Sequence, residues 1–280
     1  MTIARKHSKL IFRKTERELS RLCSTQDTEA VHRFRTTVLR LETMLEQFSP
    51  GRHRKPKKLL KRLIRIRKGA GKVRDIDVQL AMLRSLKMPL EPRRKRQLAQ
   101  GLLELRAKHE SGLRKMLKKS DIREVRKRLA RAAKEVTFEA RVDPLAIARQ
   151  MLQSVPVSPN PADENTLLRF RRVVKRARYA AEFARASTES KLLIAQLKRL
   201  EDVIGHWQDW CTLTHTAIGR LGDVTQSSLV AALNTVTRAQ FRHAVAAVSA
   251  AKTAALARNG VEQKSTTKAA AAVERPGAKT

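Results

Sequence analysis

The chain has 280 residues, a length that fits one large domain or two modest ones. Lys and Arg total 61 against 26 Asp and Glu, so the formal net charge is +35 and we expect a polyanionic partner. No run of about 18 apolar residues is present to span a bilayer, and the first residues lack the apolar stretch of a secretory signal, so we expect a cytoplasmic protein that binds no membrane.

Helix formers dominate the composition and strand signals are scarce, so the predicted fold class is all-α. In chain order, the sequence predicts helices over 5–22, 28–48, 56–86, 92–118, 122–137, 144–153, 163–186, 189–220 and 226–257. Asp27 or Thr28 can cap the second of these helices.

A cluster of prolines divides the chain into two parts. Pro156, Pro159 and Pro161 forbid a continuous helix, so we place a Pro-rich linker at 154–162. It separates a first helical half at 1–153 from a second helical half at 163–258. Residues 259–280 are low in large apolar side chains and are predicted to form a disordered tail.

The two halves repeat one another. VHRFRTTVLRLETMLEQF, from Val31, aligns with LLRFRRVVKRARYAAEF, from Leu167, so that Arg35 matches Arg171. Further on, Gly71 matches Gly205 and Asp75 matches Asp209. Self-similarity of this kind predicts two pseudo-symmetric antiparallel helical bundles that arose by internal duplication.

Basic residues follow one stripe of the third predicted helix, opposite apolar positions such as Leu63 and Ile66. This stripe comprises Lys57, Lys61, Arg65, Lys68 and Lys72, and it extends for about 22 Å at about 1.5 Å per residue. Like charges at i, i+4 destabilise a helix, so the stripe requires an anion or a neighbouring acidic face.

Asp75 and Asp209 lie among many cations, which favours a role as structural tethers for residues such as Arg74 or Arg178. No nucleophile or metal-ligand cluster accompanies either carboxylate, and phosphate-loop and zinc-protease motifs are missing from the sequence. The spacing of Cys23 and Cys211 fits neither a disulfide framework nor a metal site, so both are expected to be free thiols. We therefore expect no enzyme, no cofactor and no metal.

Four segments, VHRFRTTVLR, GKVRDIDV, LLRFRRVVKRARYAAEF and LEDVIGHWQD, occur in the order found in the conserved histidine α-helical domain (CHAD) family. The resemblance extends from about residue 5 to 257. It implies two helical bundles around a basic groove or pore, inorganic polyphosphate as the ligand and, in some members, association with polyphosphate granules. It maps the family's functional positions to His32, Arg35, Arg40, Arg74, Asp75, Asp77, Arg171, Lys175, Arg176, Arg178 and Tyr179.

The sequence departs from the family pattern at three basic positions, which hold Leu39, Glu42 and Leu168. The element IGHWQD keeps only Gly205 and Asp209 of the family's second-half pattern. We therefore expect the two halves to contribute unequally, with weaker binding in the first.

The predicted function is non-catalytic binding of inorganic polyphosphate, with granule proteins as further partners. The candidate contacts are His32, Arg35, Arg40, Lys57, Lys61, Arg65, Lys68, Lys72, Arg171, Lys175, Arg178 and Lys198. The alternative is a nucleoid-associated protein that binds nucleic acid, and in the leading hypothesis nucleic acid is a weaker, non-specific partner. Aromatic residues make up only 4% of the chain and no helix-turn-helix or zinc motif is visible, which disfavours the alternative. Oligomeric state is left open by the sequence.

Overall fold

A computed structural model describes residues 5–49, 54–86, 92–136, 142–154 and 163–273. Over these ranges the chain is entirely helical, which confirms the all-α prediction. The helices are α1 (Arg5–Ser24), α2 (Thr28–Phe48), α3 (Arg54–Ser85), α4 (Pro92–Met116), α5 (Lys119–Glu135), α6 (Pro144–Gln153), α7 (Glu164–Ala181), α8 (Thr188–Leu221) and α9 (Ser228–Val273).

Side-chain caps define where several helices begin. Of the two candidates at the start of α2, Asp27 is the cap, and its carboxylate accepts a 2.6 Å hydrogen bond from the amide of Ala30. Asp163 caps α7 in the same way, and Ser187 forms a capping box with Ser190 at α8. These short polar side chains satisfy backbone N–H groups that have no partner within the helix.

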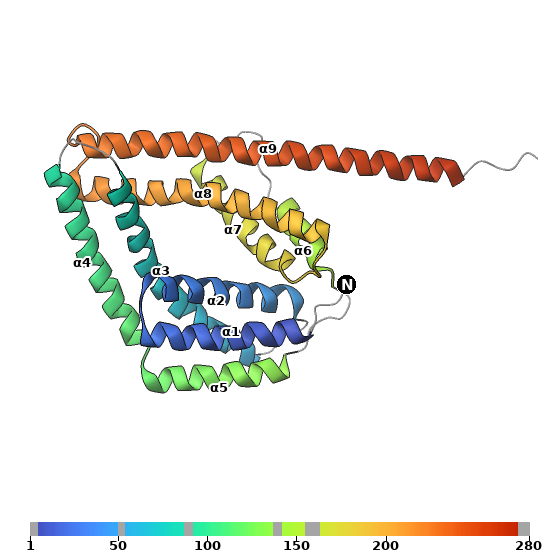
Figure 1. Cartoon of the computed structure of the whole chain (residues 1–280), viewed down its shortest axis with the longest axis horizontal. Helices are drawn as coiled ribbons and strands as arrows, with labels where there is room; N and C mark the ends of the chain where they lie inside the picture. Colours follow the sequence, from blue (N-terminus) through green and yellow to red (C-terminus); the bar gives the residue numbers. More distant parts are fainter. Residues whose placement is uncertain (1–4, 50–53, 87–91, 137–141, 155–162, 274–280) are drawn as a thin grey trace, which may run out of the picture.

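The helices form two groups that face one another (Figure 1). α1 packs between α2 and α5, and α8 packs between α7 and α9. α3 and α4 connect the two groups, and α2 also packs on α7. α6 packs on α7, so it belongs by contact to the second group although sequence analysis assigned residues 144–153 to the first half.

The apolar core passes through both groups. Its larger cluster contains Phe34 of α2, Ile66 of α3, Val174 of α7 and Trp207 of α8, all of them buried. A smaller cluster joins α3, α4, α8 and the start of α9 around Leu102. The halves are therefore held to one another by burial of shared apolar side chains.

Two predicted segments lie near the limits of the described residues. Apart from Ser154, the linker predicted at 154–162 lies outside them. α9 continues to Val273, whereas the sequence predicted a helix end at 257 and a disordered tail from 259. This segment contains many alanines and no proline before Pro276, and both features favour helix. None of the helices in the described ranges is long and apolar enough to cross a membrane.

Candidate functional site

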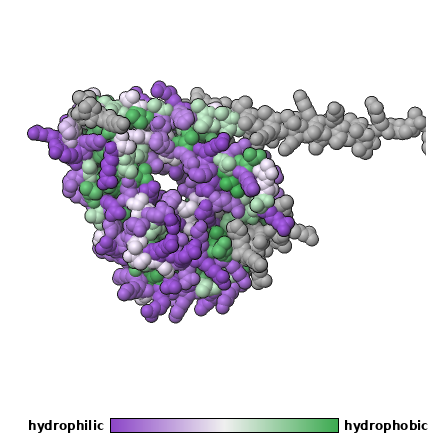
Figure 2. All heavy atoms as spheres, viewed as in Figure 1, coloured by the Kyte–Doolittle hydropathy of each residue, from purple (hydrophilic) through white to green (hydrophobic). Residues whose placement is uncertain are grey.

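The space-filling view shows an opening between the two groups of helices, with mainly hydrophilic side chains around it (Figure 2). Charged residues from both halves gather here. We call the following set the central cluster: His32 and Arg35 of α2; Lys72, Arg74 and Asp75 of α3; Arg171 and Lys175 of α7; and Asp209 of α8.

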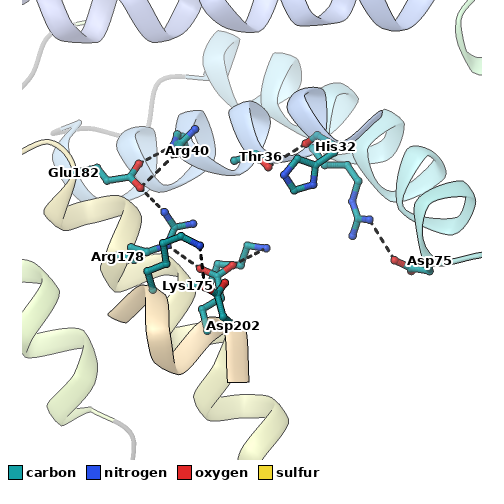
Figure 3. A network of polar contacts seen from close by, with 11 residues as sticks. His32, Thr36, Arg40, Asp75, Lys175, Arg178, Glu182 and Asp202 are labelled. Atoms are coloured by element: carbon teal, nitrogen blue, oxygen red, sulfur yellow. Dashed lines mark hydrogen bonds and ion pairs between the residues drawn. The ribbon is translucent and has the colours of Figure 1, made fainter. Parts of the chain in front are cut away.

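In the first half, Arg35 is held across the next helix. Its Nη1 donates a 3.2 Å hydrogen bond to Asp75 Oδ1, and the guanidinium lies over Gly71, where a Cβ would be 3.7 Å from it. Figure 3 shows this pair beside His32. Asp75 therefore holds Arg35, rather than the Arg74 or Arg178 named by sequence analysis.

Arg171 lies over Gly205 of α8 in the same manner, but more tightly. A Cβ at residue 205 would be 3.0 Å from Arg171 Nη2 and 3.4 Å from its Nε. That Nε is buried and has no hydrogen-bond partner. Gly205 is thus the residue that gives this guanidinium room, and the arginine, glycine and aspartate aligned in the two halves lie in corresponding places. The internal duplication itself stays a prediction.

Asp209 differs from Asp75 in its surroundings. Burial raises the pKa of its carboxyl above the usual range and so does the charge of Asp75, while Arg171, His206 and Arg74 act in the opposite direction. No hydrogen bond joins Asp209 to Arg171 in the described structure, so Asp209 acts on the arginine through charge alone. α3 and α8 pack on one another, and the charge of Asp75 acts on Asp209 across that contact.

Charges from both halves also affect the pKa of His32. Burial lowers its pKa below the usual 6.5, and the cations Arg74, Lys175 and Arg35 lower it further. The carboxylate of Glu29 acts in the opposite direction. Lys175 belongs to α7, a helix of the second half that packs on α2. The positive charges of the two halves therefore converge on one place.

Arg40 and Arg178 were predicted as ligand contacts, but each is engaged by carboxylates (Figure 3). Arg40 Nε donates to Glu182 at 2.6 Å, and Arg178 pairs with Glu182 and, at 2.7 Å, with Glu201. Their guanidinium groups also lie over the Tyr179 ring, 5.1 Å and 4.3 Å from its centroid. These arginines join α2, α7 and α8. The Arg40–Glu182 pair spans 142 residues and was not visible in the sequence, whereas Glu182 lies only four residues after Arg178.

Lys175 and Lys198 are paired as well. Lys175 Nζ lies 3.2 Å from Glu201, and burial lowers its pKa, which Glu201 partly offsets. Lys198 donates to Asp202 at 2.8 Å on the exposed surface of α8. Of the predicted second-half contacts, Arg171 therefore has no hydrogen-bonded acid among the described residues, unlike Lys175, Arg178 and Lys198.

The predicted stripe on α3 is exposed along its whole length. Lys57, Lys61, Arg65, Lys68 and Lys72 make no ion pair with any described residue. Glu42, which sequence analysis regarded as neutralising the first half, instead accepts a 3.0 Å hydrogen bond from Arg67. The stripe ends at Lys72, one helical turn before Asp75, so it leads into the central cluster.

Three residues that lie at or near the central cluster were not predicted as ligand contacts. Arg74 had a signal, since it belongs to the RD-x-D element, and its charge lowers the pKa of His32. His109 of α4 had no signal in the sequence. Burial and the charges of Lys72 and Lys108 lower its pKa, while the charge of Asp75 acts to raise it. His206 accepts a 3.1 Å hydrogen bond from Trp210 Nε1.

The described residues form an all-helical fold in which cations of both halves surround a central opening. The sequence matches the profile of the CHAD domain over residues 9–217, about three quarters of the chain, and the protein therefore belongs to the CHAD family. This confirms the resemblance found in the sequence. Comparison with curated proteins produced no match.

Two solved structures share the fold. PptA from Streptomyces chartreusis is 16% identical, with a TM-score of 0.63 over 86% of this chain and 93% of that one. The CHAD domain from the plant Ricinus communis is 18% identical, with a TM-score of 0.59 over 82% of each chain. Identities this low establish the common architecture.

Gly205→Ala should displace Arg171 and lower the affinity for a polyanion in the central cluster about threefold, the loss of one contact of about 0.7 kcal/mol. Gly71→Ala should have a smaller effect because Arg35 leaves 3.7 Å for the new methyl group. Gly219→Ala, on the same helix with nothing within 4 Å, is the control and should leave binding unchanged. Equal affinities of the Gly205 and Gly219 variants, measured by titration with polyphosphate, would contradict the role of Gly205.

Proposed function

We propose that this protein binds inorganic polyphosphate without chemical turnover, in the opening lined by the central cluster. The CHAD family is associated with polyphosphate, and the residues here fit that ligand. The observation that carries the proposal is that α2 packs on α7 and α3 on α8, with Arg35 over Gly71 and Arg171 over Gly205, so that cations of both halves lie near one another.

Linear polyphosphate is a flexible chain with about one charge per phosphorus, so cations on facing helices can contact successive phosphates without reading any base. Neutralising several phosphates releases counterions, and the logarithm of the affinity should fall linearly with the logarithm of salt concentration. Titration of the parent with long-chain polyphosphate between 50 and 400 mM salt measures this slope. An affinity that does not change with salt would refute binding by this cluster.

The proposed location is the cytoplasm, at polyphosphate granules, where several chains could bind one polymer. A catalytic role is not part of the proposal. Incubation of the purified protein with polyphosphate and each common divalent metal, followed by phosphate detection, tests this point, and sustained phosphate release would overturn it. Tagged protein that stays diffuse in granule-containing cells would argue against the location.

Polyphosphate should bind more tightly as the pH falls from 8 toward 5.5. The pKa of His32 is lowered in the free protein, and a bound polyanion raises it because negative charge favours the imidazolium. Binding therefore takes up a proton, and this contribution should be about threefold to tenfold in affinity. His32→Gln should bind with a flatter pH profile, and identical profiles of parent and variant would exclude His32 as the titrating contact.

Lower pH should reduce the stability of the ligand-free protein through His32, although it strengthens binding. The folded pKa of His32 lies below the unfolded value, so protonation favours the unfolded chain and stability without ligand should fall as the pH drops below about 6.5. Thermal unfolding of free parent and His32→Gln over this pH range separates the folding effect from binding.

A further inference from the structure

The outer face of α5 carries a second row of cations, away from the central cluster. α5 lies at the edge of the molecule, and α1 and α2 separate it from α7 and α8 (Figure 1). Its apolar side chains Ile122, Val125 and Leu129 are buried against its neighbours. At 3.6 residues per turn, four exposed cations fall within about 80° of one another on the opposite side of the helix. We call them the α5 ridge: Arg123, Lys127, Arg131 and Lys134.

Of the three acids of α5, Asp121 lies away from this ridge, whereas Glu124 and Glu135 border one edge of it. Asp121 pairs with Arg62 of α3, and Glu124 accepts a 2.7 Å hydrogen bond from Arg128. The pKa of Glu124 is lowered first by Arg128 and less by Lys127 and Arg131. No ion pair to a ridge residue is found among the described residues, so its four charges are open to solvent.

The α3 stripe shares this arrangement, but the outward faces of α4 and α8 do not. The exposed side of α4 mixes cations with Glu104 and the apolar Leu103, and on α8 the exposed Lys198 is paired with Asp202. Like charges spaced at i, i+4 destabilise a helix by a few tenths of a kcal/mol per pair. A row of four such charges, with acids along one edge only and no ion pair to any of them among the described residues, is therefore more than the average surface of a basic protein.

The shape of the ridge favours a rigid partner. From Arg123 to Lys134 it extends about 16 Å, over which one strand of B-form DNA presents about five phosphates. The ridge is exposed at the edge of the molecule and none of the described helices packs over it, so a flexible polymer would lose conformational freedom there without being enclosed. A duplex presents its phosphates already ordered. α5 contains no aromatic side chain, so it offers no platform for stacking the bases of a single strand.

We propose that the α5 ridge binds the phosphate backbone of duplex nucleic acid, without base recognition and separately from the central cluster. The protein then has two polyanion surfaces, one at the opening and one at the edge of the molecule. Binding of duplex at the ridge does not depend on the function proposed for the central cluster. One chain can hold both polymers at once, and that consequence does rest on the proposed function.

Two variants of the full chain, each lacking four positive charges, test the proposal. The ridge variant carries Arg123→Gln, Lys127→Gln, Arg131→Gln and Lys134→Gln, and the central-cluster variant carries Arg35→Gln, Lys72→Gln, Arg74→Gln and Arg171→Gln. The probe is a fluorescent 30-base-pair duplex of mixed sequence, titrated between 50 and 200 mM salt. The ridge variant should bind it at least about tenfold more weakly at 100 mM salt, with a log–log salt slope smaller by about 3 to 4. The central-cluster variant should stay within about threefold of the parent, because its substitutions lie outside the ridge.

Several results would overturn the proposal. Equal losses of duplex affinity in both variants would mean that only net charge matters. A ridge variant that keeps duplex binding but loses polyphosphate would make the ridge an extension of the polyphosphate path. One that keeps duplex binding but loses binding to phosphatidylserine vesicles would make it a membrane contact. Circular dichroism melting confirms that each variant is folded, and single substitutions at Lys127 and Arg131 replace the quadruple variant if it is not.

Discussion

Replacing Arg35, Lys72, Arg74 and Arg171 with glutamine should lower the affinity for long-chain polyphosphate about 100-fold at physiological salt, if each exposed contact contributes about 0.7 kcal/mol. None of the four belongs to the buried ion pairs between α2, α7 and α8, so the fold should persist. Arg35 loses its bond to Asp75, whose carboxylate is exposed to solvent and can be hydrated. The measurement is a titration with polyphosphate of defined length, at several salt concentrations.

The ridge variant is the matched control because it removes the same number of charges. Its affinity for polyphosphate should stay within about threefold of the parent, since the lost charges lie outside the opening and are screened beyond about 8 Å at this salt concentration. A central-cluster variant that binds polyphosphate like the parent would place the ligand elsewhere. Similar losses in both variants would mean that the long-range field, rather than the opening, carries the binding.

Glu201→Gln should lower the free energy of unfolding by about 3 kcal/mol, because it leaves two buried cations without their carboxylate. Burial alone would raise the pKa of Glu201, but Lys175 and Arg178 outweigh burial and hold it below the usual range. The side chains of Glu201 and Arg178 are each only 12% exposed, so little water compensates for the loss. For a chain of this size, the melting temperature should fall by about 6–12 °C.

Asp202→Asn provides the control for this prediction at the adjacent residue. Asp202 pairs with Lys198, and both side chains are more than 60% exposed, so the change should cost less than about 0.5 kcal/mol. Because the Glu201 carboxylate is favoured in the folded state, its contribution should be present above about pH 4.5 and lost as the pH falls below it. Equal melting temperatures of the two variants would show that the buried network does not stabilise the fold.

The ion pairs of Lys175 and Arg178 with Glu201 also change how many cations each half has left for a ligand. Sequence analysis expected a weaker first half because Leu39 and Glu42 replace basic residues. In the structure the Glu42 carboxylate is bound by Arg67, while the second half directs Lys175 and Arg178 into carboxylates of its own. The cations left for a ligand are therefore more evenly divided than the residue types imply. Unequal contributions of the halves stay a prediction, and separate Arg35→Gln and Arg171→Gln variants measure them.

Most helix boundaries were predictable because local signals define them. Asp27, Asp163 and Ser187 are short polar caps placed directly before apolar-periodic segments. The end of α9 was not predicted, since alanine-rich sequence low in large apolar residues satisfies both the criteria for a tail and the propensity for helix. The contact of Arg171 with Gly205 could not be predicted. The sequence showed only that Gly71 aligns with Gly205, and the role of each glycine depends on how closely the neighbouring helix packs.

The sequence alone determined the class of the fold and the family, and its net charge predicts a polyanionic partner. Helix periodicity, caps and net charge are properties of neighbouring residues or of the whole chain, and they need no knowledge of packing. The tertiary structure decided which cations are available. Arg40, Lys175 and Arg178 look like ligand contacts in the sequence but face Glu182 and Glu201 in the fold, whereas Arg171 lies over a glycine with no hydrogen-bonded acid. The physical reason is that ion pairing depends on distances of a few ångströms between residues far apart in the chain, which only the packing of helices determines.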